Sequence, residues 1–129
     1  MSYEAKMQEM KEHYEEAGRS YEKANNAPDA RTRQAYQEHG DEAYGKGAKA
    51  AEEAKKEVRN EWCKEFSDCE KKSEEAYKKG DMKAAKEYRQ KAEKAMEEGE
   101  KKEKQIDNQQ KEHSQEARKK MDGLEKTRY

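Results

Sequence analysis

Apolar and small residues recur three or four positions apart along most of the chain, with charged residues between them. We call this set of positions the seam. Near the N-terminus it consists of Tyr3, Met7, Met10, Tyr14, Ala17, Tyr21 and Ala24. A spacing that alternates between four and three keeps these residues on one face of an α-helix. Ser2 can cap this helix, and Asn25, Asn26 and Pro28 end it, so the pattern predicts a first helix over 3–25.

A second run begins after Asp29, a predicted N-cap, and no proline interrupts it before Gly80. Its seam comprises Tyr36, Gly40, Ala43 or Tyr44, Gly47, Ala51, Ala54, Val58, Trp62, Phe66, Cys69 and Ala76. Gly45 and Gly47 weaken the helix, because each helical Gly costs about 1 kcal/mol relative to Ala. Since no turn residues flank them, the pattern favours one long helix over 30–79, and 45–47 is the place where it could kink. A full break there, which gives four helices, is the alternative.

Residues 76–99 predict the end of one helix, a two-residue turn and the start of the next. Gly80 suits a left-handed helix stop, and Asp81 suits the following N-cap. The third seam comprises Met82, Ala85, Tyr88, Ala92, Ala95, Gly99, Ile106, His113, Ala117, Met121 and Leu124. Because Gly123 should end or fray this helix, we expect it over 82–122. It is long enough to run back beside the other two, and the sequence predicts an all-α antiparallel bundle of three long helices.

The seam pattern also repeats at an offset of 52 residues without gaps. Ala24, Asp29, Tyr36, Ala43, Gly47 and Lys49 match Ala76, Asp81, Tyr88, Ala95, Gly99 and Lys101, while Met10, Tyr14 and Ala17 fall opposite Trp62, Phe66 and Cys69. The chain then forms a single helical domain over 1–129, with two related helical hairpins in copies 1–52 and 53–104 and a helical extension over 105–129. Helical chains also share this period by chance, so duplication and coincidence both stay open.

The composition limits both the size of the core and the classes of partner that the protein could bind. Charged residues make up 47% of the chain and hydrophobic residues only 29%, with one each of Leu, Ile, Val and Phe. Apolar content this low is typical of disordered chains, but a net charge of −1 and the helical spacing favour a folded protein with a narrow core. The near balance of 30 Lys and Arg against 31 Asp and Glu excludes a global attraction to nucleic acid or anionic lipid.

The two cysteines and the hydropathy pattern bear on location. Cys63 and Cys69 are six residues apart on a predicted helix, about 9 Å along its axis, so they cannot bridge each other. No apolar run is long enough for a membrane span or a signal peptide. We therefore expect an intracellular, reducing location, which is the cytoplasm or, as the alternative, the nucleus.

The predicted turn resembles a known family. The stretch SEEAYKKGD at 73–81, followed by Ala85 and Lys86, resembles the turn of a helical domain of unknown function that often precedes Smr (small MutS-related) endonuclease domains. Gly40 and the stretch AAEEA at 50–54 resemble the later part of that domain. The nuclease motifs I-D-L-H-G and T-G-x-G-x-S are absent, so the resemblance implies a helical accessory module without nuclease activity. Tetratricopeptide hairpins share the turn pattern, but their repeat of about 34 residues fits poorly.

No residue pattern predicts catalysis, a cofactor or a metal site. The three histidines, His13, His39 and His113, each follow a glutamate, and none belongs to the E-x-x-H motif of di-iron bundles. A two-histidine surface zinc site formed by His13 and His39 is a weaker alternative. The G-x-G at 45–47 lies within a helical run with no strand before it, so it does not predict a phosphate loop.

The leading functional hypothesis is a non-enzymatic helical interaction module, such as an adaptor or a small subunit of a larger assembly. Aromatic and Met side chains are favoured at protein interfaces, and the candidate partner surface consists of Trp62, Phe66, Tyr77, Tyr88 and Met96. An RNA- or ribosome-associated accessory protein is the alternative, with Arg118, Lys119 and Lys120 as phosphate contacts. A further alternative is a hydrophilic stress protectant, because AKAAEEAKKE at 48–57 resembles stretches of late-embryogenesis proteins.

Overall fold

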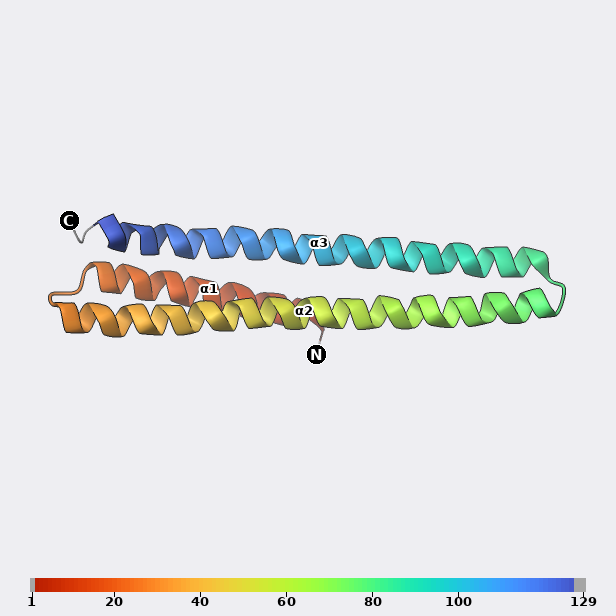
Figure 1. Cartoon of the computed structure of the whole chain (residues 1–129), viewed down its shortest axis with the longest axis horizontal. Helices are drawn as coiled ribbons and strands as arrows, with labels where there is room; N and C mark the ends of the chain where they lie inside the picture. Colours follow the sequence, from red (N-terminus) through yellow and green to blue (C-terminus); the bar gives the residue numbers. More distant parts are fainter. Residues whose placement is uncertain (1, 127–129) are drawn as a thin grey trace. The chain divides into compact units, whose positions relative to one another are not determined.

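The computed structural model describes residues 2–126, with side chains to residue 122, and these residues form three α-helices (Figure 1). The helices are α1 (Tyr3–Asn25), α2 (Ala30–Lys78) and α3 (Met82–Lys126), and no strand occurs in this part of the chain. The predicted all-α bundle of three helices is therefore confirmed. Helix α2 passes through Gly45 and Gly47 without a break, which confirms one long helix and excludes the four-helix alternative.

Helix α3 continues through Gly123 to Lys126, so the expectation that it ends at residue 122 was wrong. A glycine lowers helix stability by only about 1 kcal/mol and does not by itself stop a helix.

Each helix begins with a side-chain cap of the predicted kind. Ser2, Asp29 and Asp81 accept a hydrogen bond from the backbone N–H three residues further on, at 3.4, 2.7 and 3.1 Å. Such bonds satisfy amides that have no partner within the helix. The bond from Thr32 N–H lowers the pKa of Asp29, because it stabilises the ionised carboxylate. Local sequence therefore determines where the three helices start.

The helices form two compact units. The three-helix unit contains the residues up to Ala54 and those from Ile106 onward, so it holds α1, the first half of α2 and the end of α3. The two-helix unit contains Lys55–Gln105, which is the hairpin of α2 and α3. No helix in the described part of the chain combines the length and apolar character that a membrane span requires.

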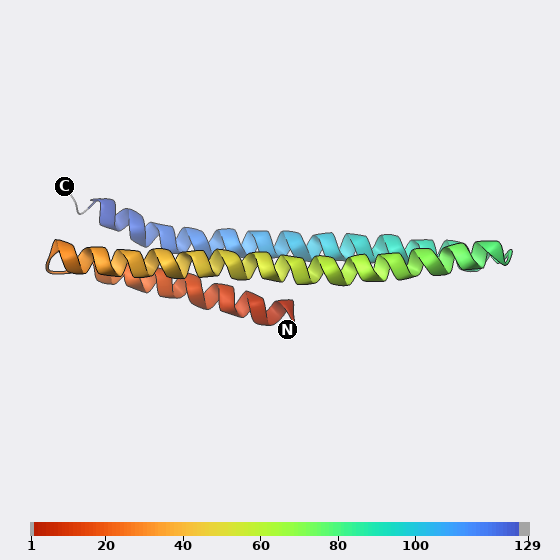
Figure 2. The same ribbon diagram turned by 60° about the horizontal axis from the view of Figure 1, so that its bottom comes forward.

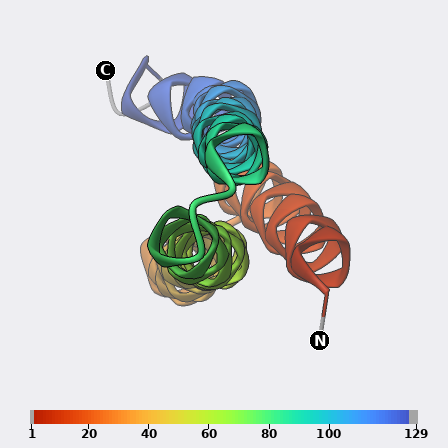
Figure 3. The same cartoon turned by 90° about the vertical axis from the view of Figure 1, so that its right-hand side faces the viewer.

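In the three-helix unit, α1 lies beside the N-terminal part of α2 and to one side of the α2–α3 pair (Figures 2 and 3). Its core cluster consists of Ala17, Tyr21, Ala24, Ala43 and Ala117, with Tyr44 and Met121 packed against it. Two tyrosine rings of α1 lie on glycines of α2. A Cβ atom at Gly40 would lie 2.6 Å from the Tyr21 ring, and one at Gly47 would lie 2.9 Å from the Tyr14 ring. The glycines therefore allow α1 and α2 to approach closely.

Both buried rings keep their hydroxyl groups hydrogen-bonded. Tyr21 donates to Asp41 Oδ1 at 2.6 Å, and the Tyr14 hydroxyl accepts from Gln110 Nε2 at 3.2 Å. Burial raises the pKa of both tyrosines, because it disfavours the phenolate, and the Asp41 carboxylate raises the pKa of Tyr21 further.

One member of the predicted seam of α2, Tyr36, is exposed. Tyr36 is 37% exposed, and its ring lies 6.0 Å from the Lys23 ammonium group. Its position fits the seam spacing, but it lies in the second turn of α2, where few residues of a neighbouring helix can cover it. Tyr36 therefore lies at an exposed position of the seam and outside the core.

Candidate interaction groove in the hairpin of α2 and α3

The hairpin turn has the geometry that its sequence predicts. Gly80 has φ 80°, the left-handed conformation that a residue with a Cβ atom rarely adopts. Its N–H donates to the Tyr77 carbonyl at 3.0 Å, and the Asp81 N–H donates to the Ala76 carbonyl at 2.9 Å. These two bonds define a Schellman motif, which ends α2 and lets α3 start after a short connection.

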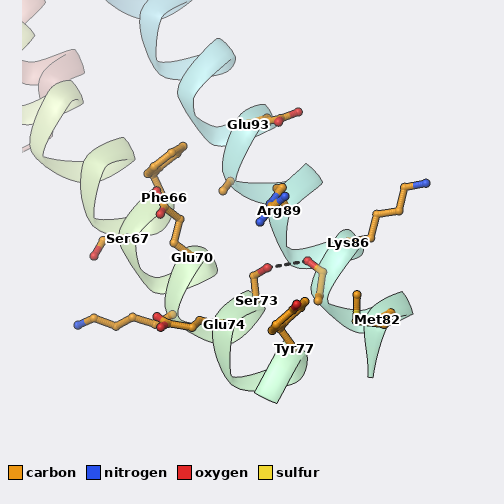
Figure 4. A pocket seen from close by; sticks show the side chains of 13 residues that line it. Phe66, Ser67, Glu70, Ser73, Glu74, Tyr77, Met82, Lys86, Arg89 and Glu93 are labelled. Carbon is orange, nitrogen blue, oxygen red and sulfur yellow. Dashed lines mark hydrogen bonds between the residues drawn. The ribbon is translucent and has the colours of Figure 1, made fainter. Parts of the chain in front are cut away.

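The buried contact between the two helices is made of small residues. Its buried members are Val58, Ser73, Ala76, Ala85, Ala92, Ala95 and Gly99. Ser73 was not among the predicted seam residues, yet it is 7% exposed and its hydroxyl donates to the Ala85 carbonyl at 2.8 Å (Figure 4). Such short side chains bring the helices close together but bury little apolar surface.

Trp62 is held inside the hairpin by a polar cluster. Its ring lies directly on Gly99, and its Nε1–H donates to Glu103 Oε2 at 3.1 Å. Arg59 donates to the other carboxylate oxygen from Nε and Nη2, at 2.9 and 2.6 Å. The Glu103 side chain is only 12% exposed. The helical period could not identify this cluster, because Glu103 resembles the surrounding surface charges in sequence.

A groove of about 1030 Å³ lies along one side of the hairpin, next to the turn (Figure 4). It is lined from α2 by Phe66, Ser67, Glu70, Lys71, Ser73, Glu74 and Tyr77, and from α3 by Met82, Ala85, Lys86, Arg89, Ala92 and Glu93.

Large apolar side chains border this groove and small ones line its centre. Tyr77 is 63% exposed and Met82 is 58% exposed, whereas Phe66 is half-buried. Met82 was expected in the seam, but it is the first residue of α3 and more than half of its surface is exposed. Ala85 and Ala92 are buried. The groove therefore exposes apolar surface to solvent.

Both walls carry charges of both signs, with one more acidic group on the α2 wall and one more basic group on the α3 wall. The α2 wall holds Glu70, Lys71 and Glu74, and the α3 wall holds Lys86, Arg89 and Glu93. Figure 4 shows Glu70 and Arg89 on opposite walls. Among residues 2–122, Glu74 lies 3.7 Å from the Lys78 ammonium group, whereas Glu70, Lys86, Arg89 and Glu93 form no ion pair or hydrogen bond. Their charges are consequently available to a molecule that enters the groove.

The structure does not bring the five predicted partner residues together on one surface. Phe66 and Tyr77 line the groove. Trp62 packs on Gly99, as described above. Tyr88 and Met96 are partly buried and are not among the lining residues, and the ring of Tyr88 lies 5.9 Å from the Lys72 ammonium group.

The three predicted phosphate contacts, in the three-helix unit, all have intramolecular partners. They are Arg118, Lys119 and Lys120. Lys120 Nζ lies 3.1 Å from a carboxylate oxygen of Glu22, and Lys119 Nζ lies 3.3 Å from one of Glu116. The Arg118 guanidinium stands over an aromatic ring of α2, 5.9 Å from its centroid. A phosphate group would have to compete with these contacts.

No histidine or cysteine is among the residues that line the groove. His39 Nε2 lies 3.0 Å from Glu16 Oε1, in a contact between α1 and α2. Cys63 and Cys69 both carry free thiols. Among the residues that the structure describes, no three His, Cys, Asp or Glu side chains are grouped so that they could hold a metal ion.

Comparisons of the chain with protein-family models, with curated proteins and with solved structures find no match. The resemblance to the helical domain that precedes Smr endonuclease domains therefore stays a prediction. The groove itself is the feature from which function can be argued.

Proposed function

We propose that the protein is a non-enzymatic helical interaction module, and that the hairpin of α2 and α3 binds a protein partner through its groove. The observation that carries this proposal is the pairing of exposed Tyr77 and Met82 with a lining of small residues in a single groove. Tyr and Met are enriched where proteins meet, because each combines a large apolar surface with adaptable contacts.

Stability provides the physical reason for a partner. The two-helix unit buries small side chains, and each square ångström of buried apolar surface contributes only about 25 cal/mol. A partner that covers Phe66, Tyr77 and Met82 adds the apolar burial that the hairpin lacks. Any molecule that binds only the folded form also stabilises that form by mass action.

Site-specific photo-crosslinking tests this function. Tyr77→p-benzoylphenylalanine in the full chain places the reactive group in the groove, where we expect an adduct with a protein partner in cells. Glu75→p-benzoylphenylalanine is the matched control, because Glu75 is exposed on the same turn of α2 but does not line the groove. An adduct at neither position, or equal adducts at both, contradicts the proposal.

A further inference from the structure

We propose that the occupant of the groove is a second copy of this chain. In this arrangement, two hairpins of α2 and α3 face each other across their grooves and form a four-helix bundle. The two copies are related by a two-fold axis parallel to the helices. This inference rests on the proposed function, since it names the partner that the groove binds.

Contacts within the hairpin establish which residues of α2 and α3 lie at the same level. Ser73 bonds the Ala85 carbonyl, the Lys72 ammonium lies over the Tyr88 ring, and Trp62 lies on Gly99. Three levels follow along the groove, starting from the turn: Tyr77 with Met82 and then Glu70 with Arg89 (Figure 4). By the same register, Phe66 is level with Ala92.

A two-fold axis parallel to the helices places α2 of one copy opposite α3 of the other at the same level. Phe66 then faces the small Ala92 of the second copy, and Tyr77 faces Met82. In the middle, the Glu70 carboxylate faces the Arg89 guanidinium of the second copy. Each contact occurs twice, because the symmetry is two-fold. At these three levels the groove is therefore complementary to itself in both size and charge.

The other face-to-face arrangement lacks this complementarity. A two-fold axis perpendicular to the helices places each helix opposite the same helix of the second copy. The middle level of one copy then faces the middle level of the other. Glu70 then meets Glu70, and Arg89 meets Arg89, so like charges repel at the centre of the interface. Both arrangements make all neighbouring helices antiparallel, which is usual in four-helix bundles, so the charges at the middle level decide between them.

The size of the groove sets the expected strength of the dimer. On each helix the lining residues span three turns, about 16 Å. Two such faces bury on the order of 1,000 Å² in total, which is the lower end for specific protein interfaces. A dissociation constant in the micromolar range is expected for an interface of this size, so monomer and dimer should exchange.

Analytical ultracentrifugation of the purified full chain tests the dimer. Between about 1 µM and about 1 mM protein, the mass should rise from 15.2 kDa to twice that value. Glu70→Arg and Arg89→Glu should each weaken the dimer about tenfold or more, because each variant opposes like charges twice. An equal mixture of the two variants should dimerise again, because the mixed dimer restores both opposite-charge contacts.

Glu75→Lys is the matched control, since it reverses a charge outside the groove and should leave the dimer unchanged. Far-UV circular dichroism checks that each variant is folded. A chain that stays monomeric at about 1 mM overturns the inference, and so does a dimer that the mixture of charge variants does not restore. If the chain is monomeric but position 77 crosslinks to a different protein, the inference fails while the proposed function stands. If neither occurs, both fail.

Discussion

Replacing Gly99 with alanine should destabilise the two-helix unit, although alanine is the better helix former. A Cβ atom at position 99 would overlap Cβ, Cγ and Cδ1 of Trp62. These atoms are among those nearest the backbone, so a rotation of the ring alone cannot remove the overlap. The bond from Trp62 Nε1 to Glu103, at 3.1 Å, opposes any larger movement. Either the helices must separate or the indole must leave its site.

The magnitude follows from two opposing effects. Helix propensity favours the alanine variant by about 1 kcal/mol. Overpacking costs about 1–3 kcal/mol, and the loss of a hydrogen bond to the Glu103 carboxylate costs about 1.5–3 kcal/mol where the indole is displaced. We therefore expect Gly99→Ala to lower the free energy of unfolding by about 1–2 kcal/mol. Gly45→Ala is the control, because no atom lies within 4 Å of the added Cβ, and it should gain about 1 kcal/mol.

Urea and thermal unfolding of the three proteins measure this difference. Far-UV circular dichroism follows the helices, and the fluorescence of Trp62, the single tryptophan, follows the hairpin. The two variants should differ by about 10 °C in melting temperature, since 1 kcal/mol corresponds to roughly 4 °C in a chain of this length. In a Trp62→Ala background the Cγ and Cδ1 atoms are absent and most of the overlap is relieved, so Gly99→Ala should become neutral or stabilising.

The reasoning is refuted if Gly99→Ala stabilises the protein as much as Gly45→Ala does. That result would mean that the indole does not lie on Gly99 and that the hairpin has another register. Equal effects of Gly99→Ala with and without Trp62 would place the cause elsewhere in the helix.

Three further predictions concern the turns and the titrating groups. Gly80→Ala should cost about 1 kcal/mol in urea unfolding because φ is 80°, and an unchanged midpoint would argue against this turn. Tyr21→Phe removes the bond to Asp41 and should cost about 1–2 kcal/mol. Because the pKa of Tyr21 is raised, its contribution to stability is complete below pH about 10 and is lost at higher pH. The free energy of unfolding, measured by urea titration, should therefore fall less steeply with alkaline pH in the variant than in the wild type. The pKa of Asp29 is lowered, so its contribution is present above pH about 4 and lost in acid, and Asp29→Asn should flatten the acid limb of a melting-temperature profile.

Features that depend on a few neighbouring residues could be predicted from the sequence. The caps at Asp29 and Asp81 and the stop at Gly80 are local, because each needs only a side chain and the next turn of backbone. The seam of α1 was also predictable, since its spacing determines which face is apolar. The continuity of α2 followed from the lack of turn residues beside Gly45.

Contacts between helices could not be predicted in the same way. Asp41 and Glu103 look like surface charges in the sequence, yet they bond Tyr21 and Trp62. Such pairs depend on how far one helix is displaced along another, and a repeating period leaves that displacement undetermined. For the same reason, the sequence could not show where the candidate partner residues lie: Tyr77 lines the groove, whereas Trp62 packs within the hairpin.

The rings that lie on glycines in the three-helix unit limit the number of structures that this sequence can adopt. The pairs are Tyr14 with Gly47 and Tyr21 with Gly40. A seam of alanines alone would tolerate a slip of one turn, because similar small residues recur along it. Here a slip of four residues would bring Tyr21 against Tyr36 or Tyr44. The Tyr21 ring would then collide with a second tyrosine ring, whereas it now lies on the backbone of a glycine. The competing alignments of α1 thus become sterically unfavourable, and a chain with few aliphatic residues can still specify a unique native state.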